Sequence, residues 1–360
     1  MATPTIIRAV SVDTLDIPLH TPFGIAGGAQ DIARNLLVTV ELADGTCGYG
    51  EAAPFPAFNG ETQAVARAAL EAARTTVEGA DVREWRRIAA ALRSAMGPVG
   101  SAQCALETAI LDALMRHRQL PLWAFFGGAS TSLETDMTIT TGTVEQGAAA
   151  AQAILTRGIR TLKVKIGMGD LALDLERIVA IHAAAPEALL ILDGNASLSA
   201  DLALQLVAML RERGVTPALF EQPVAADDWD GLYQVAQWSG VPVAADESVA
   251  NAGQALRALQ ERSAHVVNIK LMKSGIVEAL DIAAVCRAGG MGLMIGGMVE
   301  SILAMTTSAC FAAGLGGFSY VDLDTPLFMA QTPFEGGMTY TGGRLELGHI
   351  QAGHGVTPKR

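Results

Sequence analysis

One strand with two lysines decides the fold: residues 161–167 read Thr-Leu-Lys-Val-Lys-Ile-Gly. Because successive side chains on a strand point to opposite faces, Lys163 and Lys165 share one face while the apolar residues face a packed layer. Two neighbouring ammonium groups repel each other, which lowers a lysine's pKa towards the range in which an amine acts as a base. The alternative is an edge strand whose lysines face water and discourage pairing.

The pattern that follows favours the first interpretation. From Glu134 onward, strand, turn and helix repeat at roughly constant intervals, which indicates parallel βα units. Polar residues gather at one end of these strands only, as they do at the carboxyl ends of a barrel. We therefore expect an α/β fold with a modified TIM barrel, of the (β/α)8 type. The expected strands are residues 134–140, 160–166, 188–193, 217–221, 241–246, 265–270, 291–295 and 318–322.

The first part of the chain has a different pattern. Residues 6–18 and 35–51 alternate as strands. Helical spacing follows over residues 61–78, 82–96 and 101–118, with residues 98–100 as a break between the last two. This order predicts an α+β capping domain over residues 1–125. Between its first two strands, the glycine-rich residues 21–28 predict a mobile loop.

The remaining boundaries follow from the same patterns. We expect the barrel over residues 126–330. From residue 331 the chain alternates again, with glycine pairs at 336–337 and 342–343 as turn signals. We interpret residues 331–360 as strands that return to the capping domain.

Composition restricts the class of partner. The chain has 360 residues, of which 50% are hydrophobic and 17% charged, and its net charge is −12. An acidic surface repels nucleic acid and anionic membranes, so we expect neither as a partner and a small molecule as the substrate. The four cysteines lie far apart in apolar stretches without metal-type spacing, and neither a signal peptide nor a membrane span is evident. These features predict free thiols and a cytoplasmic protein.

Three successive strands end in a carboxylate. They are Asp193 in Leu-Asp-Gly-Asn, Glu221 in Glu-Gln-Pro and Asp246 in Asp-Glu-Ser, each one βα unit after the last. Three converging anions repel one another unless a cation lies between them. Oxygen-only ligands suit Mg²⁺ better than zinc, so we expect one Mg²⁺ per active site. The alternative is that each residue caps a following helix.

The sixth strand adds a further lysine. Asn268 and Lys270 share a face there, as the two lysines of the second strand do. The second and sixth strands lie on opposite sides of an eight-stranded ring, so Lys165 and Lys270 should face each other across the metal. Such a pair suggests two bases acting on the two faces of one carbon. Lys273 lies beyond the strand, and we expect it at the surface or at a helix start.

This combination of motifs resembles the enolase superfamily, in its muconate lactonizing enzyme subgroup, and is most similar to the dipeptide epimerases. The resemblance covers the whole chain. It implies that Lys165 and Lys270 are the catalytic acid/base pair and that Lys163 supports Lys165. It also implies Mg²⁺ ligation by Asp193, Glu221 and Asp246. The mandelate racemase subgroup would need a histidine base near the seventh strand, and residues 295–301 contain none.

The chemistry of such a site is proton abstraction next to a carboxylate. Mg²⁺ bound to that carboxylate stabilises the enediolate as charge develops, and a lysine ammonium offsets the rest. Lysines on both faces support racemisation or epimerisation. The same arrangement could also run a β-elimination or a cycloisomerisation, so the barrel alone does not select the reaction.

The eighth strand offers a feature that discriminates between these reactions. Asp322 and Asp324 are two residues apart, and they are similar to the Asp-x-Asp that holds the α-ammonium of the substrate in dipeptide epimerases. Muconate and succinylbenzoate have no ammonium, so the pair favours a dipeptide. The alternative is that both aspartates are turn and capping residues before Pro326. The reaction would then be muconate cycloisomerisation or o-succinylbenzoate synthesis. A barrel that binds without turnover would leave the buried lysines without a use.

Substrate side chains should contact the capping domain and the barrel rim. The candidate contacts are Phe23 and Ile25 in the loop, Phe55 and Phe58 in residues 54–59, and Met298 and Asn195. Between Pro18 and Gly60 the basic residues are His20 and Arg34, and neither is in the apolar part of the loop. We therefore expect hydrophobic or uncharged L,L-dipeptides. Barrels of this kind often assemble, so a homo-oligomer can be expected, although no stretch marks an interface.

Overall fold

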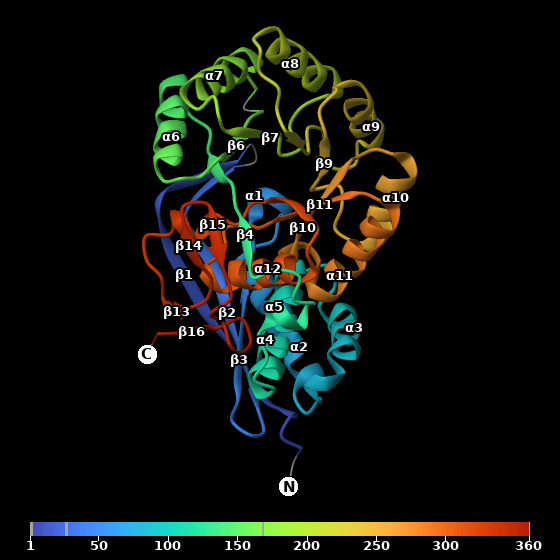
Figure 1. Cartoon of the computed structure of the whole chain (residues 1–360). Coiled ribbons are helices and arrows are strands. Elements are labelled where there is room, and N and C mark those ends of the chain that lie inside the picture. The colour runs from blue at the N-terminus through green and yellow to red at the C-terminus, as the bar shows by residue number, and fades with distance from the viewer. Residues whose placement is uncertain (1–2, 26–27, 168, 360) are drawn as a thin grey trace.

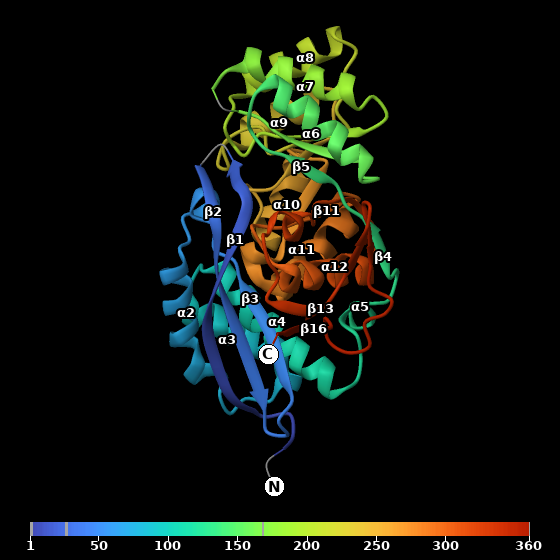
Figure 2. The same ribbon diagram turned by 90° about the vertical axis from the view of Figure 1, so that its left-hand side faces the viewer.

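The computed structural model describes residues 3–25, 28–167 and 169–359. Its first part is an antiparallel sheet in the order β1 (Ile7–Ile25), β2 (Gly28–Leu42) and β3 (Cys47–Ala52). Helices cover one side of this sheet, as Figure 2 shows. They are α2 (Gln63–Val77), α3 (Trp85–Met96) and α4 (Gly100–His117). The short α1 (Pro56–Asn59) precedes α2, η1 (Val82–Glu84) lies between α2 and α3, and α5 (Leu122–Phe125) follows α4.

The β1–β2 hairpin is longer than expected. Residues 21–25 are strand rather than loop, and Phe23 pairs with Gln30 after a register shift that follows Pro18. The predicted mobile loop is therefore wrong for residues 21–25 and 28, which belong to the two strands, and Ala26 and Gly27 lie outside the described residues. The far end of the hairpin reaches the barrel, because the ring of Phe23 lies 5.4 Å from that of Phe328.

The second part confirms the predicted barrel fold. Eight parallel strands follow one another in chain order from β5 to β12. The two end strands approach each other, since the backbone N–H of Asp136 donates to Val321 O at 2.9 Å. The strands are β5 (Met137–Ile139), β6 (Thr161–Lys165), β7 (Leu189–Asp193), β8 (Leu219–Glu221), β9 (Val243–Ala245), β10 (Val266–Lys270), β11 (Gly292–Gly296) and β12 (Phe318–Val321).

Helices follow the first seven of these strands and surround them (Figure 1). They are α6 (Val144–Thr156), α7 (Leu171–Ala184), α8 (Ala200–Glu212), α9 (Trp229–Trp238), α10 (Ala252–Glu261), α11 (Leu271–Gly289) and α12 (Ile302–Leu315). Inside the ring, Ile191, Leu219 and Val266 form a small apolar core with neighbours from the other strands. Residues two positions further along these strands share that face, and they include Asp193, Glu221 and Asn268. The barrel interior therefore supports a polar layer at its carboxyl end.

The C-terminal residues form short strands. β13 (Phe334–Gly336) pairs with β16 (Val356–Pro358), whereas β14 (Thr339–Thr341) and β15 (Arg344–Glu346) extend a sheet with β4 (Ser132–Glu134). The last strand also contacts α4, because Arg116 Nη2 donates to Val356 O at 2.7 Å. The chain end therefore contacts both the capping helices and the segment that enters the barrel.

Candidate functional site

The lysine strand lies inside the sheet, which excludes the edge-strand alternative. β6 pairs with β5 on one side and with β7 on the other. Lys163 is 0% exposed and Lys165 is 5% exposed, while Leu162 and Val164 on the other face are fully buried. Two buried lysines need partners, because an isolated buried charge is strongly unfavourable.

The partners are the carboxylates that end the next strands. Asp193 and Glu221 are directly paired across β7 and β8, and Asp246 follows β9 by one residue. All three side chains are 0% exposed. The structure therefore brings the predicted carboxylates together, and none of them caps a helix: the caps of α8, α9 and α10 are Ser199, Asp228 and Asn251.

The Glu-Gln-Pro motif fixes this row. Gln222 has a positive φ of 30°, a conformation that residues other than glycine rarely adopt. Its Oε1 accepts from the backbone N–H of Asp246 at 2.9 Å and of Ser248 at 3.2 Å, and its Nε2 donates to the Ser248 hydroxyl. One strained residue at the end of β8 thus determines the position of the carboxylate after β9.

Four of the five lysines in the chain meet at these carboxylates. Lys165 Nζ lies 2.6 Å from Asp193 Oδ2, and Lys270 Nζ lies 2.6 Å from Asp246 Oδ2. The predicted pair therefore occupies the two ends of the carboxylate row, with Glu221 between them. This is the geometry expected for groups that approach one atom from opposite sides.

Lys163 is bound by carboxylates on three sides. Its Nζ lies 2.9 Å from Asp193, 2.8 Å from Glu221 and 2.6 Å from Asp322. Burial alone would lower the pKa of Lys163, but these carboxylates outweigh it and raise the pKa well above its usual value. Lys163 is therefore a cation held among anions.

Lys273 lies at a helix start, in the first turn of α11, as expected, but the alternative of a surface position was wrong. Its side chain is 4% exposed, and its Nζ donates to Asp246 O at 2.7 Å, to Asp246 Oδ1 at 2.9 Å and to Asn268 O at 2.8 Å. The physical reason is that α11 begins directly after β10, so its first turn folds back over the strand ends. The sequence signal that could have indicated this role is that four of the five lysines lie in two short stretches, residues 161–167 and 268–273.

The protonation of the row follows from burial and from these cations. Burial raises the pKa of Glu221 to about 7, with Asp193 as a further cause. Burial would also raise the pKa of Asp193 and Asp246, but the neighbouring lysines outweigh it and lower both. Asp193 and Asp246 are therefore anionic at neutral pH, whereas burial keeps the pKa of Glu221 raised even though Lys163 lies 2.8 Å away.

This donor set fits Mg²⁺. Its ligand atoms are carboxylate oxygens, which hard divalent cations prefer. Among the described residues, Glu221 Oε2 and Asp246 Oδ2 accept no hydrogen bond and face lysine ammonium groups only. Both oxygens are therefore directed towards positive charge in the same small space.

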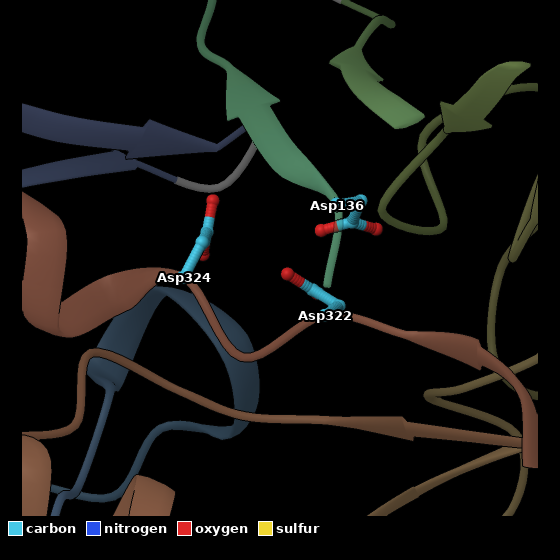
Figure 3. Close-up of side chains that lie close together, drawn as sticks. All are labelled: Asp136, Asp322 and Asp324. Atoms are coloured by element: carbon cyan, nitrogen blue, oxygen red, sulfur yellow. The ribbon is translucent and has the colours of Figure 1, made fainter. Parts of the chain in front are cut away.

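A second acidic cluster lies beside the row. Asp322, Asp324 and Asp136 place one carboxylate oxygen each within 4.8 Å of the others (Figure 3). Asp322 faces Lys163, while Asp324 is 0% exposed and accepts from the backbone N–H of Thr138 at 2.6 Å. The sequence did not indicate Asp136, which precedes β5 without a recognisable motif.

A small chamber of about 20 Å³ lies between the lysines and the capping domain. Five of the predicted substrate contacts line it together with Asp322, namely Phe23, Phe55, Phe58, Asn195 and Met298. The side chain of Ile25 lies outside the described residues. The full lining is Phe23, Phe55, Phe58, Thr138, Lys163, Lys165, Asn195, Lys270, Gly297, Met298, Asp322 and Thr325.

Family models match both parts of the chain. The model of the mandelate racemase/muconate lactonizing enzyme N-terminal domain matches residues 7–127, and the enolase C-terminal domain-like model matches residues 146–360. The chain belongs to the enolase superfamily. This confirms the resemblance drawn from the lysine and carboxylate motifs.

Several relatives of this enolase-superfamily chain are named dipeptide epimerases. The aromatic dipeptide epimerase of Herpetosiphon aurantiacus is 54% identical over 98% of this chain and 99% of its own length. A mandelate racemase/muconate lactonizing enzyme from Roseiflexus sp. superposes with a TM-score of 0.96 at 63% identity, covering 100% of both chains. The dipeptide epimerase of Enterococcus faecalis V583, complexed with Mg and L-Leu-L-Tyr, has a TM-score of 0.94 at 31% identity and covers 98% of this chain and 99% of that one. The prediction of an isomerase is confirmed.

Membrane insertion through a helix finds no support in the described part of this enolase-superfamily chain. None of its helices combines the length and the apolar character needed to cross a bilayer.

Proposed function

We propose that this protein is a Mg²⁺-dependent epimerase of hydrophobic dipeptides, acting at the carbon next to the substrate carboxylate. One observation carries the proposal: Lys165 and Lys270 lie at opposite ends of a row of three buried carboxylates. A carbon held between two such amines can lose a proton from one face and regain it on the other.

A dipeptide is favoured because an anionic wall lies beside the reaction centre. Asp322 lines the chamber, with Asp324 and Asp136 close behind it. A substrate with a positively charged amino terminus suits this wall, whereas a dicarboxylate without an ammonium would be repelled. The names of the Herpetosiphon and Enterococcus relatives support the same substrate class.

Hydrophobic side chains are favoured by the walls of the chamber. Phe23, Phe55, Phe58 and Met298 line it. The predicted absence of a basic group here has support, since His20 and Arg34 are both exposed. An acidic second residue would therefore find no cation from this hairpin, and an apolar or aromatic one would find matching surface.

The lysines would carry the proton. In one direction Lys165 Nζ, as a neutral amine, takes the proton from the α-carbon while the Lys270 ammonium delivers its own proton to the opposite face. The reverse direction exchanges the two roles. Lys163 would hold positive charge beside Asp193 and Glu221 throughout, and Phe58 and Met298 would keep water away from the intermediate.

Asp193, Glu221 and Asp246 would hold the Mg²⁺. Bound there, the ion would supply Lewis-acid stabilisation of the charge that develops on the substrate carboxylate. The remaining catalytic work falls to the lysines.

Solvent deuterium uptake tests the proposal. Pooled L,L-dipeptides are incubated with the protein and Mg²⁺ in deuterated water, and each exchanged α-proton adds about one mass unit. We expect uptake confined to dipeptides with apolar or aromatic second residues, and loss of epimerisation in Lys165→Ala and Lys270→Ala. Lys359→Ala is the matched control, because Lys359 is an exposed lysine that donates to Thr332 O and does not line the chamber.

Two results would contradict the proposal. Strong preference for acidic second residues would overturn the hydrophobic specificity. Uptake that persists in Asp322→Ala, or uptake by no dipeptide at all, would favour a cycloisomerase or an o-succinylbenzoate synthase.

A further inference from the structure

Asp136 is a buried carboxylate without a hydrogen bond. It lies between β4 and β5, and its residue is 1% exposed. Within the described residues, neither Oδ1 nor Oδ2 has a hydrogen-bond partner, and the same holds for Oδ1 of Asp324. Figure 3 shows that its side chain converges with those of Asp322 and Asp324, which come from the segment after β12. An unpaired buried carboxylate directed into an acidic cluster requires compensation.

The charged groups around Asp136 supply too little positive charge to offset the buried carboxylates. Among the residues that the structure describes, Lys163 on β6 is the cation that acts on Asp136, and it is shared with Asp193, Glu221 and Asp322. Glu221 on β8 adds further negative charge. The phenol of Tyr340 on β14 donates to Leu323 O at 2.7 Å and is therefore engaged elsewhere. Three carboxylates this close cannot all be ionised beside one shared cation.

Protonation of a carboxyl group is the remaining way to offset the negative charge of the cluster. Burial, with Asp322 and then Asp324 as further causes, raises the pKa of Asp136 well above its usual value. Burial and Asp322 likewise raise the pKa of Asp324 to about 7. Asp136 and Asp324, the two carboxyls whose pKa is raised, therefore favour a bound proton between them near neutral pH.

We propose that Asp136, Asp322 and Asp324 form one proton-sharing unit that exchanges its proton for the α-ammonium of the substrate. The inference rests on the proposed dipeptide function. When the ammonium binds at Asp322, its positive charge replaces that of the proton, which leaves to solvent, and no covalent bond other than O–H changes. Asp136 lies behind Asp322, so it is a positioning residue that sets the charge of the subsite.

Selectivity for a free amino terminus follows from this exchange. A ligand with an acylated amino terminus brings no positive charge, so it cannot displace the proton and meets a neutralised, less complementary wall. Asp136, which lies behind Asp322, thus controls whether the site accepts a free or an acylated amino terminus.

The test is calorimetric titration of the Mg²⁺-loaded protein at pH 6.5 in two buffers of different ionisation enthalpy. The ligand is L-phenylalanyl-α-aminoisobutyrate, which has no α-proton at its second residue and so is not turned over. At this pH a dipeptide amine, with a pKa near 8, is almost fully an ammonium. We expect the release of up to about one proton per bound ligand. The N-acetylated ligand, with the same carboxylate at the metal, should release none and corrects for protons lost elsewhere.

Variants assign the proton to the cluster. Asp136→Asn keeps the shape but removes one acidic group, and we expect proton release to fall by at least half. Asp281→Asn, the same change at an exposed residue, should release as much as the unmodified protein. If the free dipeptide binds but its heat of binding is the same in both buffers, this inference is wrong while the proposed function stands. That outcome needs no variant. Undiminished release by Asp136→Asn also overturns it, whereas failure of the dipeptide to bind overturns the proposed function itself.

Discussion

The ammonium of Lys273 lies 2.9 Å from Oδ1 of Asp246, while Oδ2 of the same carboxylate faces Lys270 at 2.6 Å. Lys273 also donates to the backbone oxygens of Asp246 and Asn268. One buried ammonium thus joins the ends of β9 and β10 and orients a candidate metal ligand. Residues that hydrogen-bond to the ligands of a metal site hold those ligands in the orientation that metal binding requires.

Replacing Lys273 should therefore weaken metal binding. We expect Lys273→Met, which keeps the length but removes the charge, to lower Mg²⁺ affinity by about ten- to a hundredfold. Titration of the metal in a calorimeter measures this without requiring turnover. Lys359→Met is the control, and unchanged affinity in Lys273→Met would show that Asp246 needs no such support.

Lys273 also marks where sequence reasoning reached its limit. The alternation of residues 161–167 and the polar ends of successive strands were enough to predict the barrel and the meeting of Asp193, Glu221 and Lys270, because strand period and parallel order determine those positions. Lys273 depends on how closely α11 follows β10, and no periodicity specifies that. The lysine lies only three residues after Lys270, yet the turn between them decides whether it meets water or Asp246.

Asp136 was missed for a related reason. Its role depends on β12 returning beside the start of β5, so that residues almost two hundred positions apart share one space. The pairing of Phe23 with Gln30 was likewise hidden, since a glycine-rich stretch fits a loop and a tight hairpin equally well. Local patterns locate strands, whereas the closure of the ring and of the hairpin depends on contacts between distant segments.

Phe58 should control the side chain accepted by the site. Its ring lies 4.6 Å from Lys270 Nζ and lines the chamber. Under the proposed function, Phe58→Ala removes an aromatic contact worth about 1 kcal/mol, so kcat/KM for dipeptides with an aromatic second residue should fall about five- to tenfold. Dipeptides with alanine there should change less. Tyr233→Ala, at an exposed aromatic residue, is the control, and an equal loss for both substrates would argue against a role in specificity.

Glu300 should make stability depend on pH. The residue is 1% exposed and its Oε1 accepts from the backbone N–H of Met298 at 2.7 Å. Burial raises the pKa of Glu300 to about 8, well above the unfolded value near 4.3. Between these two pKa values the folded protein holds a proton on Glu300 that the unfolded chain has already lost. The stabilisation that this proton gives is full below pH 4 and is lost as pH rises through 8.

Comparison with Glu300→Gln isolates this effect. The unfolding free energy of the unmodified protein minus that of the variant should fall by about 1.4 kcal/mol per pH unit between pH 5 and 8. Urea unfolding at several pH values measures it. Glu187→Gln, at a side chain that is 79% exposed, should show no such trend. A difference that stays flat for Glu300→Gln would mean that the buried carboxylate is ionised in the folded protein.

Gly50 should be indispensable for the capping domain. A Cβ built there would collide with the carbonyl oxygen of Ala105 and lie 2.9 Å from its carbonyl carbon, because β3 packs directly on the backbone of α4. Gly50→Ala must therefore separate strand and helix, and we expect destabilisation of about 3 kcal/mol or more. Gly45→Ala is the control, since its Cβ meets nothing within 4 Å and only its positive φ of 87° is strained, at about 1 kcal/mol.

Because α4 also supports α11 through the hydrogen bond from Val277 N to Glu107, Gly50→Ala should also weaken Mg²⁺ binding, whereas Gly45→Ala should not. Equal stability of the two variants in urea would show that β3 and α4 can move apart freely.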